Sequence, residues 1–276
     1  MRVSHLGPRG TYTEVAASAW RPDATLAPKP SVPAAIAAVI EGEADAAVCA
    51  MENSIEGTAS IETLDLLIGE DFPLRICGEA VVAIRHMLVG APGADAASAT
   101  KVYSHPSALL QCRQSLARLA PEAKAVAALS TSGAIEAAMQ QRGALAVGNE
   151  RAADLYGAVI LERDIGDEPG NATRFVALGR EDAAPTGDDK TSLAFTTQHD
   201  RPGSLVEVLG LFAARQINMT RIESRPTRRQ LGTYVFFLDV QGHRSDAALA
   251  EALDATGAIT HWMRVLGSYP RWAGAA

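Results

Sequence analysis

The order of the expected strands and helices constrains the fold of this chain more than any single motif does. Over residues 1–180, short apolar runs alternate with stretches of helical periodicity, and strands separated by helices form βαβ units with mostly parallel strands. A polar segment rich in Gly, Asp and Pro follows, and we interpret residues 181–190 as a linker. Residues 191–270 then follow the order βαββαβ, which is typical of a ferredoxin-like domain. The sequence therefore predicts an α/β protein.

Several local features refine this prediction. Residues 75–90 form one long β-rich stretch, and the periodicity of residues 106–120 predicts a single helix. Ser31 and Ser245 precede helical patterns, and we expect each to be an N-cap.

Composition limits the class of partner. The chain has 276 residues, of which 47% are hydrophobic, and this is enough for two or three domains with cores of their own. The formal net charge of -7 argues against a nucleic-acid or anionic-membrane partner, although a local pocket could still be positive. No stretch reaches the roughly 20 apolar residues that span a bilayer, and the N-terminus lacks the apolar region of a secretory signal. We expect a cytoplasmic protein.

Metal and cofactor chemistry finds no support in the motifs. The three cysteines, Cys49, Cys77 and Cys112, are scattered and lack CxxC spacing, so we expect neither a disulfide framework nor a metal site. The chain has no GxGxxG after a strand, no P-loop lysine, no HExxH and no GxSxG. Hydride transfer, nucleotide-driven chemistry and metallohydrolysis are therefore disfavoured, and no cofactor is expected.

Four polar clusters occur where strands end or helices begin, which is where α/β sheets bind ligands. They are GPRGTYT (7–13), CAMENSIEGT (49–58), KVYSHPSALLQC (101–112) and EPGNATRFVALG (168–179). Each could also be an ordinary turn, cap or polar loop. In the fourth cluster, Thr173 and Arg174 begin a strand whose side chains alternate, so we expect them to face opposite ways.

Together these clusters resemble, in order and over nearly the whole chain, the motifs of the prephenate dehydratase family. The four clusters are similar to the family's GP-x-GTYS, ENS-x-EG, YSHPQAL-x-QC and N-x-TRF motifs. PGSLVEVLGLF and TRIESRP resemble the GALV and ESRP motifs of the ACT regulatory domain. The chain departs from the pattern at Ser107, where the family usually has Gln, at Ser204 in the GALV position, and over residues 58–63.

The resemblance implies a two-lobed, periplasmic-binding-protein-like dehydratase region over residues 1–180, followed by a C-terminal ferredoxin-like ACT domain. Lobe 1 is expected at about residues 1–79 and 160–180, and lobe 2 at about 80–159. Because the first strand begins at Arg2, no fused N-terminal mutase domain is expected.

The implied reaction is the decarboxylating dehydration of prephenate to phenylpyruvate in L-phenylalanine biosynthesis. The departing hydroxide needs a hydrogen-bond donor, and the resemblance assigns this role to Thr173. Glu52 is the alternative proton source, or else a carboxylate that holds the Asn53 loop. The expected substrate-binding residues are Thr11, Asn53, Ser54, Ser104, Gln111, Thr131 and Arg174, although Arg174 could equally brace the lobes.

The ACT motifs imply feedback regulation by phenylalanine at the interface of paired domains, and hence a dimer or tetramer. The expected phenylalanine-binding residues are Gly203, Ser204, Leu205, Val206, Asn218, Glu223, Ser224, Arg225 and Pro226. Glu223 is expected to accept the ammonium group. Two alternatives stay open, namely an arogenate dehydratase and a non-catalytic amino-acid-sensing protein.

Overall fold

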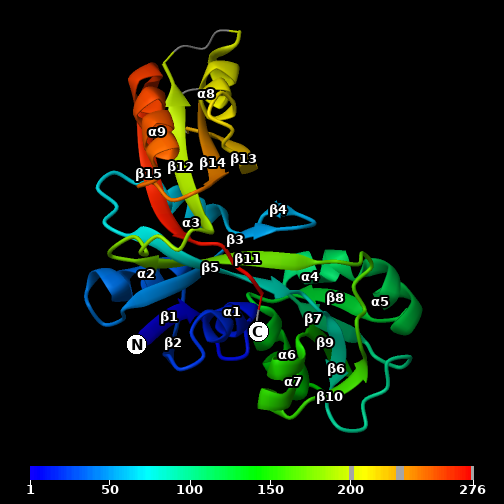
Figure 1. The fold of residues 1–276 in the computed structure, drawn as a ribbon. Coiled ribbons are helices and arrows are strands. Elements are labelled where there is room, and N and C mark those ends of the chain that lie inside the picture. Colours follow the sequence, from blue (N-terminus) through cyan, green and yellow to red (C-terminus); the bar gives the residue numbers. More distant parts are fainter. Residues whose placement is uncertain (199–201, 228–232, 275–276) are drawn as a thin grey trace. The chain divides into compact units, whose positions relative to one another are not determined.

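The computed structural model describes residues 1–198, 202–227 and 233–274 (Figure 1). Parts of the expected second domain, residues 199–201 and 228–232, therefore lie outside the described residues. The chain forms two compact units: residues 1–61 with 80–175, and residues 62–79 with 176–276. No described helix combines the length and the hydropathy that crossing a membrane would require.

A six-stranded sheet carries the N-terminal strands in the order β2-β1-β3-β11-β5, with the short strand β4 paired to β3. The strands are β1 (Arg2–Leu6), β2 (Thr25–Lys29), β3 (Ala46–Asn53), β4 (Gly57–Thr58), β5 (Arg75–Ala83) and β11 (Ala172–Gly179). The helices near them in sequence are α1 (Tyr12–Trp20), α2 (Val32–Ile40) and α3 (Ile61–Leu67). β1 lies parallel to both β2 and β3, as the βαβ pattern predicts. Ser31 is the N-cap of α2, because its side chain accepts a hydrogen bond from Ala34 N, and this prediction is confirmed.

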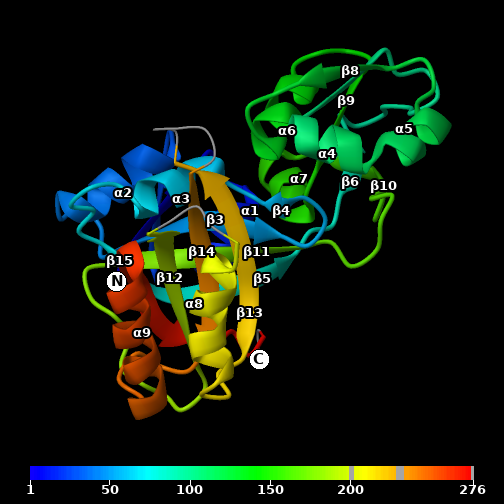
Figure 2. The same cartoon turned by 90° about the horizontal axis from the view of Figure 1, so that it is seen from above.

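A five-stranded sheet has the order β10-β6-β9-β7-β8. Its strands are β6 (Met87–Gly90), β7 (Lys101–Ser104), β8 (Lys124–Ala127), β9 (Ala144–Gly148) and β10 (Val159–Glu162). Figure 2 shows the helices α4 (Pro106–Gln111), α5 (Arg113–Leu119), α6 (Thr131–Met139) and α7 (Glu150–Tyr156) around it. β9 is buried on both faces, since Ala144 and Ala146 pack in one apolar cluster and Leu145 and Val147 in another.

One local prediction about this region is confirmed and another is wrong. Residues 75–90 are β-rich as predicted, and they form the two strands β5 and β6, because β6 pairs antiparallel with β9 and β10 in the second sheet. The helix expected over residues 106–120 is broken at Cys112, which is the C-cap of α4 and the N-cap of α5.

The C-terminal part of the second unit forms a four-stranded antiparallel sheet in the order β13-β14-β12-β15. Its elements are β12 (Asp189–Thr197), α8 (Ser204–Ala213), β13 (Met219–Pro226), β14 (Tyr234–Gln241), α9 (Ala247–Ile259) and β15 (Thr260–Pro270). Both helices pack on one face of the sheet, where Leu193 and Phe195 meet Val208, Phe212 and Leu249 (Figure 2). The predicted α/β class and the βαββαβ order are therefore confirmed. The N-cap of α9 is Asp246 and not Ser245, whose hydroxyl instead bonds His243.

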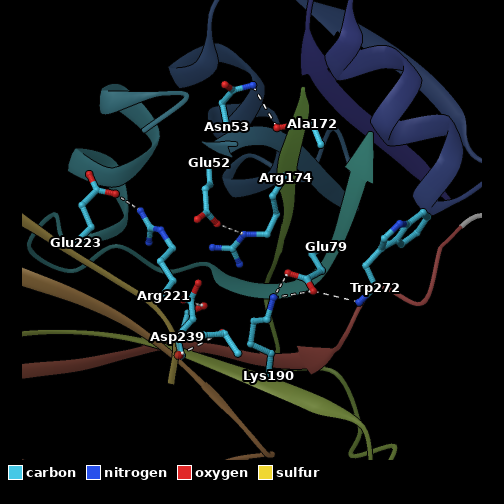
Figure 3. A network of polar contacts seen from close by, with 12 residues as sticks. Glu52, Asn53, Glu79, Ala172, Arg174, Lys190, Arg221, Glu223, Asp239 and Trp272 are labelled. Carbon is cyan, nitrogen blue, oxygen red and sulfur yellow. Dashed lines mark hydrogen bonds and ion pairs between the residues drawn. The ribbon is translucent and has the colours of Figure 1, made fainter. Parts of the chain in front are cut away.

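A buried ion pair stabilises the second unit. Lys190 Nζ in β12 donates to both carboxylate oxygens of Glu79 in β5 at 2.9 and 2.8 Å, and Trp272 N donates to the same carboxylate at 3.0 Å (Figure 3). The Glu79 side chain is only 2% exposed. We expect Glu79→Ala to lower the free energy of unfolding by about 3–5 kcal/mol in urea titrations, because it leaves Lys190 buried and unpaired.

The control for this prediction is Glu43→Ala, which breaks an exposed ion pair with Lys29 and should leave the urea midpoint unchanged. Equal shifts in the two variants would contradict a stabilising role of the buried pair.

Candidate active site

The neighbouring strands β3 and β11 bring the polar residues of two sequence clusters together. Asn53 ends β3, and its Nδ2 donates to Thr173 Oγ1 at 2.9 Å and to Asn171 Oδ1 at 2.8 Å. The Asn53 Oδ1 atom accepts hydrogen bonds from the main-chain N–H groups of Ile55 and Glu56, each at 3.0 Å. Main-chain N–H groups can only donate, so these two bonds fix the orientation of the Asn53 amide.

This orientation determines what the Thr173 hydroxyl can do. The Asn53 amide donates to Thr173 Oγ1, so the oxygen acts as an acceptor toward Asn53 and its own proton remains available for another acceptor. Among the described residues the Thr173 hydroxyl has no other hydrogen-bond partner. Thr173 is only 7% exposed. The site therefore presents a nearly buried, oriented O–H donor.

A chain of side-chain amides extends from Asn53 to helix α4. Asn171 Nδ2 donates to Gln111 Oε1 at 2.8 Å, and Gln111 Nε2 donates to Glu56 Oε1 at 2.8 Å. Because Glu56 N donates to Asn53, the four residues Asn53, Asn171, Gln111 and Glu56 close a ring with one donor direction, which we call the amide network. Hydrogen bonds arranged in this way polarise and strengthen one another.

Arg174 and Glu52, which neighbour Thr173 and Asn53 on strands β11 and β3, form a separate ion pair. Arg174 Nε donates to Glu52 Oε2 at 3.0 Å, and the Arg174 side chain is 7% exposed (Figure 3). Thr173 thus bonds Asn53 while Arg174 bonds Glu52, as strand alternation predicts. The Glu52 carboxylate is bound by a guanidinium and not by the Thr173 hydroxyl, and its proposed role as a proton source stays a prediction.

The remaining expected residues occupy strand ends and helix starts. Ser54 ties the loop after β3 to β11, because its hydroxyl accepts from Ala172 N at 2.9 Å. The Thr11 hydroxyl caps α1 and donates to Leu6 O, and the buried Ser104 hydroxyl donates to Val147 O. Thr131 is the first residue of α6, whose N-cap is Ser130. The amide network therefore includes Asn53 and Gln111, and Asn53 also bonds Thr173. The hydroxyls of Thr11 and Ser104 instead bond main-chain carbonyls.

Within the described residues, the surroundings of this site offer neither a cluster of metal-ligating side chains nor a reactive thiol. In the part of the chain that the structure describes, no group of three or more His, Cys, Asp and Glu side chains could hold a metal ion. Burial raises the pKa of the Cys112 thiol to about 12, and the Asp167 carboxylate adds to the rise. The thiol next to Gln111 is therefore not a nucleophile at neutral pH.

Comparison with known proteins identifies the family. Residues 3–183 match the family model of prephenate dehydratase, and residues 191–258 match that of the ACT domain. The chain belongs to the prephenate dehydratase family. It is 41% identical to the prephenate dehydratase of Mycobacterium sp. (strain JLS), over 98% of this chain and 89% of that protein.

Two solved structures are similar over their full length. The prephenate dehydratase of Arthrobacter aurescens in complex with L-Phe is 38% identical, with a TM-score of 0.88 over 100% of this chain and 93% of that one. GqqA, described as a novel type of quorum quenching acylase, is 33% identical, with a TM-score of 0.85 over 99% of both chains.

Sequence reasoning did not single out three residues that surround Gln111 and Asn53 in this member of the prephenate dehydratase family. Asn171 and Glu56 complete the amide network, and His86 Nε2 lies 2.8 Å from Gln111 Oε1. Asn171 and Glu56 lie within the quoted N-x-TRF-like and ENS-x-EG-like motifs, and this position was the signal that could have identified them. His86 stands in the apolar run IRHMLVG, where no motif marks it.

The expected regulatory residues lie at the start of α8 and along β13 of the ACT domain. Gly203 has φ +92° and is the N-cap of α8, and Ser204, Leu205 and Val206 form the first turn. Val206 is 70% exposed. Asn218 precedes β13, and its carbonyl accepts from Gln241 N. Ser224, Arg225 and Pro226 end β13.

Two of the expected phenylalanine-binding residues form ion pairs with charged side chains of this chain. The Glu223 carboxylate, expected to accept an ammonium group, is bound by Arg221, two residues earlier on the same strand. The Arg225 guanidinium lies 3.3 Å from Asp65 Oδ1 in α3, within the second unit.

Proposed function

We propose that this chain catalyses the decarboxylating dehydration of prephenate to phenylpyruvate in L-phenylalanine biosynthesis. The observation that carries the proposal is the Thr173 hydroxyl, which the Asn53 amide orients as a donor within motifs of the prephenate dehydratase family. Breaking the carbon–carboxylate bond releases carbon dioxide and moves its electron pair into the ring, which becomes aromatic as the ring hydroxyl leaves as hydroxide. Solvent supplies the proton that converts this hydroxide to water.

Thr173 stabilises the departing oxygen in this proposal. The O–H donates a hydrogen bond to the oxygen as negative charge develops on it, and a preorganised donor in a nearly buried site does this well. The Asn53 amide, by donating to Thr173 Oγ1, strengthens the hydroxyl as a donor. Aromatisation supplies the driving force, so the proposal assigns no cofactor or metal.

Substrate binding requires groups that hold two carboxylates. We assign this role to Asn53, Gln111 and Ser54 near the amide network, to Thr11 and Thr131 at the N-terminal ends of α1 and α6, and to Ser104 and Arg174 at strand positions. Helix N-termini favour anions through their N–H groups and dipole. In the present arrangement Arg174 binds Glu52, which supports the role of bracing the strands.

The C-terminal domain supplies regulation in this proposal. In this proposal L-phenylalanine binds at the start of α8 and along β13. The complex of the Arthrobacter aurescens relative with L-Phe supports phenylalanine as the ligand. We propose a dehydratase domain over residues 1–180, a linker over 181–190 and an ACT domain over 191–270, and the family matches support this division. The last two residues of the linker, Asp189 and Lys190, already pair within β12. Self-association through the ACT domains and a cytoplasmic location complete the proposal.

One assay tests chemistry and regulation together. Purified protein should form phenylpyruvate from prephenate, and millimolar L-phenylalanine should lower the rate. A kcat/KM larger on arogenate than on prephenate would assign the chain to arogenate dehydration instead. Absence of turnover on both substrates, with phenylalanine binding intact, would reject the enzyme and favour an amino-acid sensor. An acylase assay in parallel tests the activity named for the GqqA relative.

A further inference from the structure

His86 is a buried titratable residue beside the candidate active site. It lies between β5 and β6, is only 3% exposed, and holds its Nε2 at 2.8 Å from Gln111 Oε1. The His86 carbonyl accepts a hydrogen bond from Ile165 N at 2.9 Å. The His86 ring packs edge to face on the Tyr12 ring, with 6.2 Å between the ring centroids. Main chain and ring packing therefore hold the imidazole in place.

The partners of Gln111 determine which His86 nitrogen carries the proton. Gln111 Nε2 donates to the Glu56 carboxylate, which only accepts, so Gln111 Oε1 must face His86 and Asn171. A carbonyl oxygen only accepts, so His86 Nε2 is the donor. Nδ1 is buried and has no hydrogen-bond partner among the described residues, which favours the neutral imidazole with its proton on Nε2.

The surroundings favour this neutral form. Burial lowers the pKa of His86, while the hydrogen bond to Gln111 and the charge of Glu56 act in the opposite direction. Protonation would place a second N–H in the core at Nδ1 without an acceptor, and an unsatisfied buried donor is costly.

The residues that bind the Gln111 amide differ in exposure. Glu56 is exposed, so a substrate carboxylate can displace it from Gln111 Nε2. His86 and Asn171, both buried, bind the opposite side of the amide at Oε1. They therefore keep the Gln111 NH₂ group directed toward the ligand after Glu56 has left.

We propose that His86 is a positioning residue for the dehydration: its Nε2–H holds the Gln111 carboxamide so that the NH₂ group faces the substrate. The inference rests on the proposed function. It assigns His86 no contact with the substrate, and it predicts that the effect of His86 on turnover passes through Gln111.

A double-mutant cycle on prephenate turnover tests this inference. His86→Leu removes the donor and should lower kcat/KM by about 10- to 100-fold. His86→Gln places an amide nitrogen at the same distance along the side chain and should restore most of the loss. In the Gln111→Ala background, His86→Leu should change kcat/KM by less than about twofold, because the group that it positions is gone. His261→Leu, an exposed histidine in β15, is the control and should match the wild type.

Equal losses in the two backgrounds would overturn the inference, because an independent or purely structural role gives multiplicative effects.

A second measurement does not depend on activity or on the folding of His86→Leu. Nitrogen-15 NMR of the wild-type protein at pH 7 should show the Nε2–H tautomer of His86. The His86 signals are those that the spectrum of His86→Gln lacks. An Nδ1–H tautomer would overturn the inference, because it leaves Nε2 without the proton that Gln111 accepts. Absence of wild-type turnover would instead reject the proposed function, and the NMR result would still decide the hydrogen-bond assignment.

Discussion

Replacing Thr173 by valine lowers kcat for phenylpyruvate formation by about a hundred- to a thousandfold, the usual cost of losing one preorganised donor to a developing negative charge. Valine keeps the branched shape of threonine, so the packing of β11 is retained. The Asn53 amide keeps acceptors in Asn171 Oδ1 and Ala172 O at 2.8 and 3.2 Å, so no buried donor is left unsatisfied. The loss should therefore appear in turnover and not in stability.

The matched control is Thr173→Ser, which retains the hydroxyl and should stay within about tenfold of wild-type kcat. Steady-state kinetics on prephenate should place the loss of Thr173→Val in kcat more than in KM, because the proposed hydrogen bond strengthens in the transition state. Thermal unfolding and phenylalanine binding by calorimetry verify that both variants are folded. Wild-type turnover by Thr173→Val would remove Thr173 from the mechanism.

Periodicity was sufficient to predict those parts of the fold that depend on contacts close in sequence. The βαββαβ order of the C-terminal domain follows from alternation in its strands and from the apolar stripe of α8, in which Val208 and Phe212 are fully buried. The N-cap Ser31 is equally local. The pairing of Arg221 with Glu223 could also have been predicted from the sequence, because residues two apart on a strand share a face.

Long-range pairing limited what could be predicted of the site. Asn53 and Thr173 are 120 residues apart, and they meet because β3 and β11 are neighbours in the sheet. His86 and Gln111 meet because β5 ends at Ala83 and β6 turns into a different sheet. An apolar run containing one histidine gives no sign of such a break. The motifs therefore indicated the neighbourhood of the site, but the donor directions within it required the structure.

A glycine in β15 provides a second prediction of a large effect on stability. A Cβ atom on Gly267 would clash with Ile76 O and would lie 2.6 Å from Ile76 N, both main-chain atoms of β5 within the second unit. We expect Gly267→Ala to lower the free energy of unfolding by about 3 kcal/mol or more, at the upper end of overpacking effects. The measurement is urea unfolding followed by circular dichroism, or the soluble yield where the variant does not fold.

Gly210→Ala is the matched control and should have the opposite sign. Gly210 lies in α8, and apart from its chain neighbours and the nearby backbone of the helix no described atom lies within 4 Å of an added Cβ. Alanine should therefore stabilise the helix by up to about 1 kcal/mol. The clash at Gly267 is with main chain, so no change of rotamer relieves it, and only a shift of β5 or β15 could. A Gly267→Ala variant as stable as the wild type would therefore mean that β15 does not approach β5 this closely.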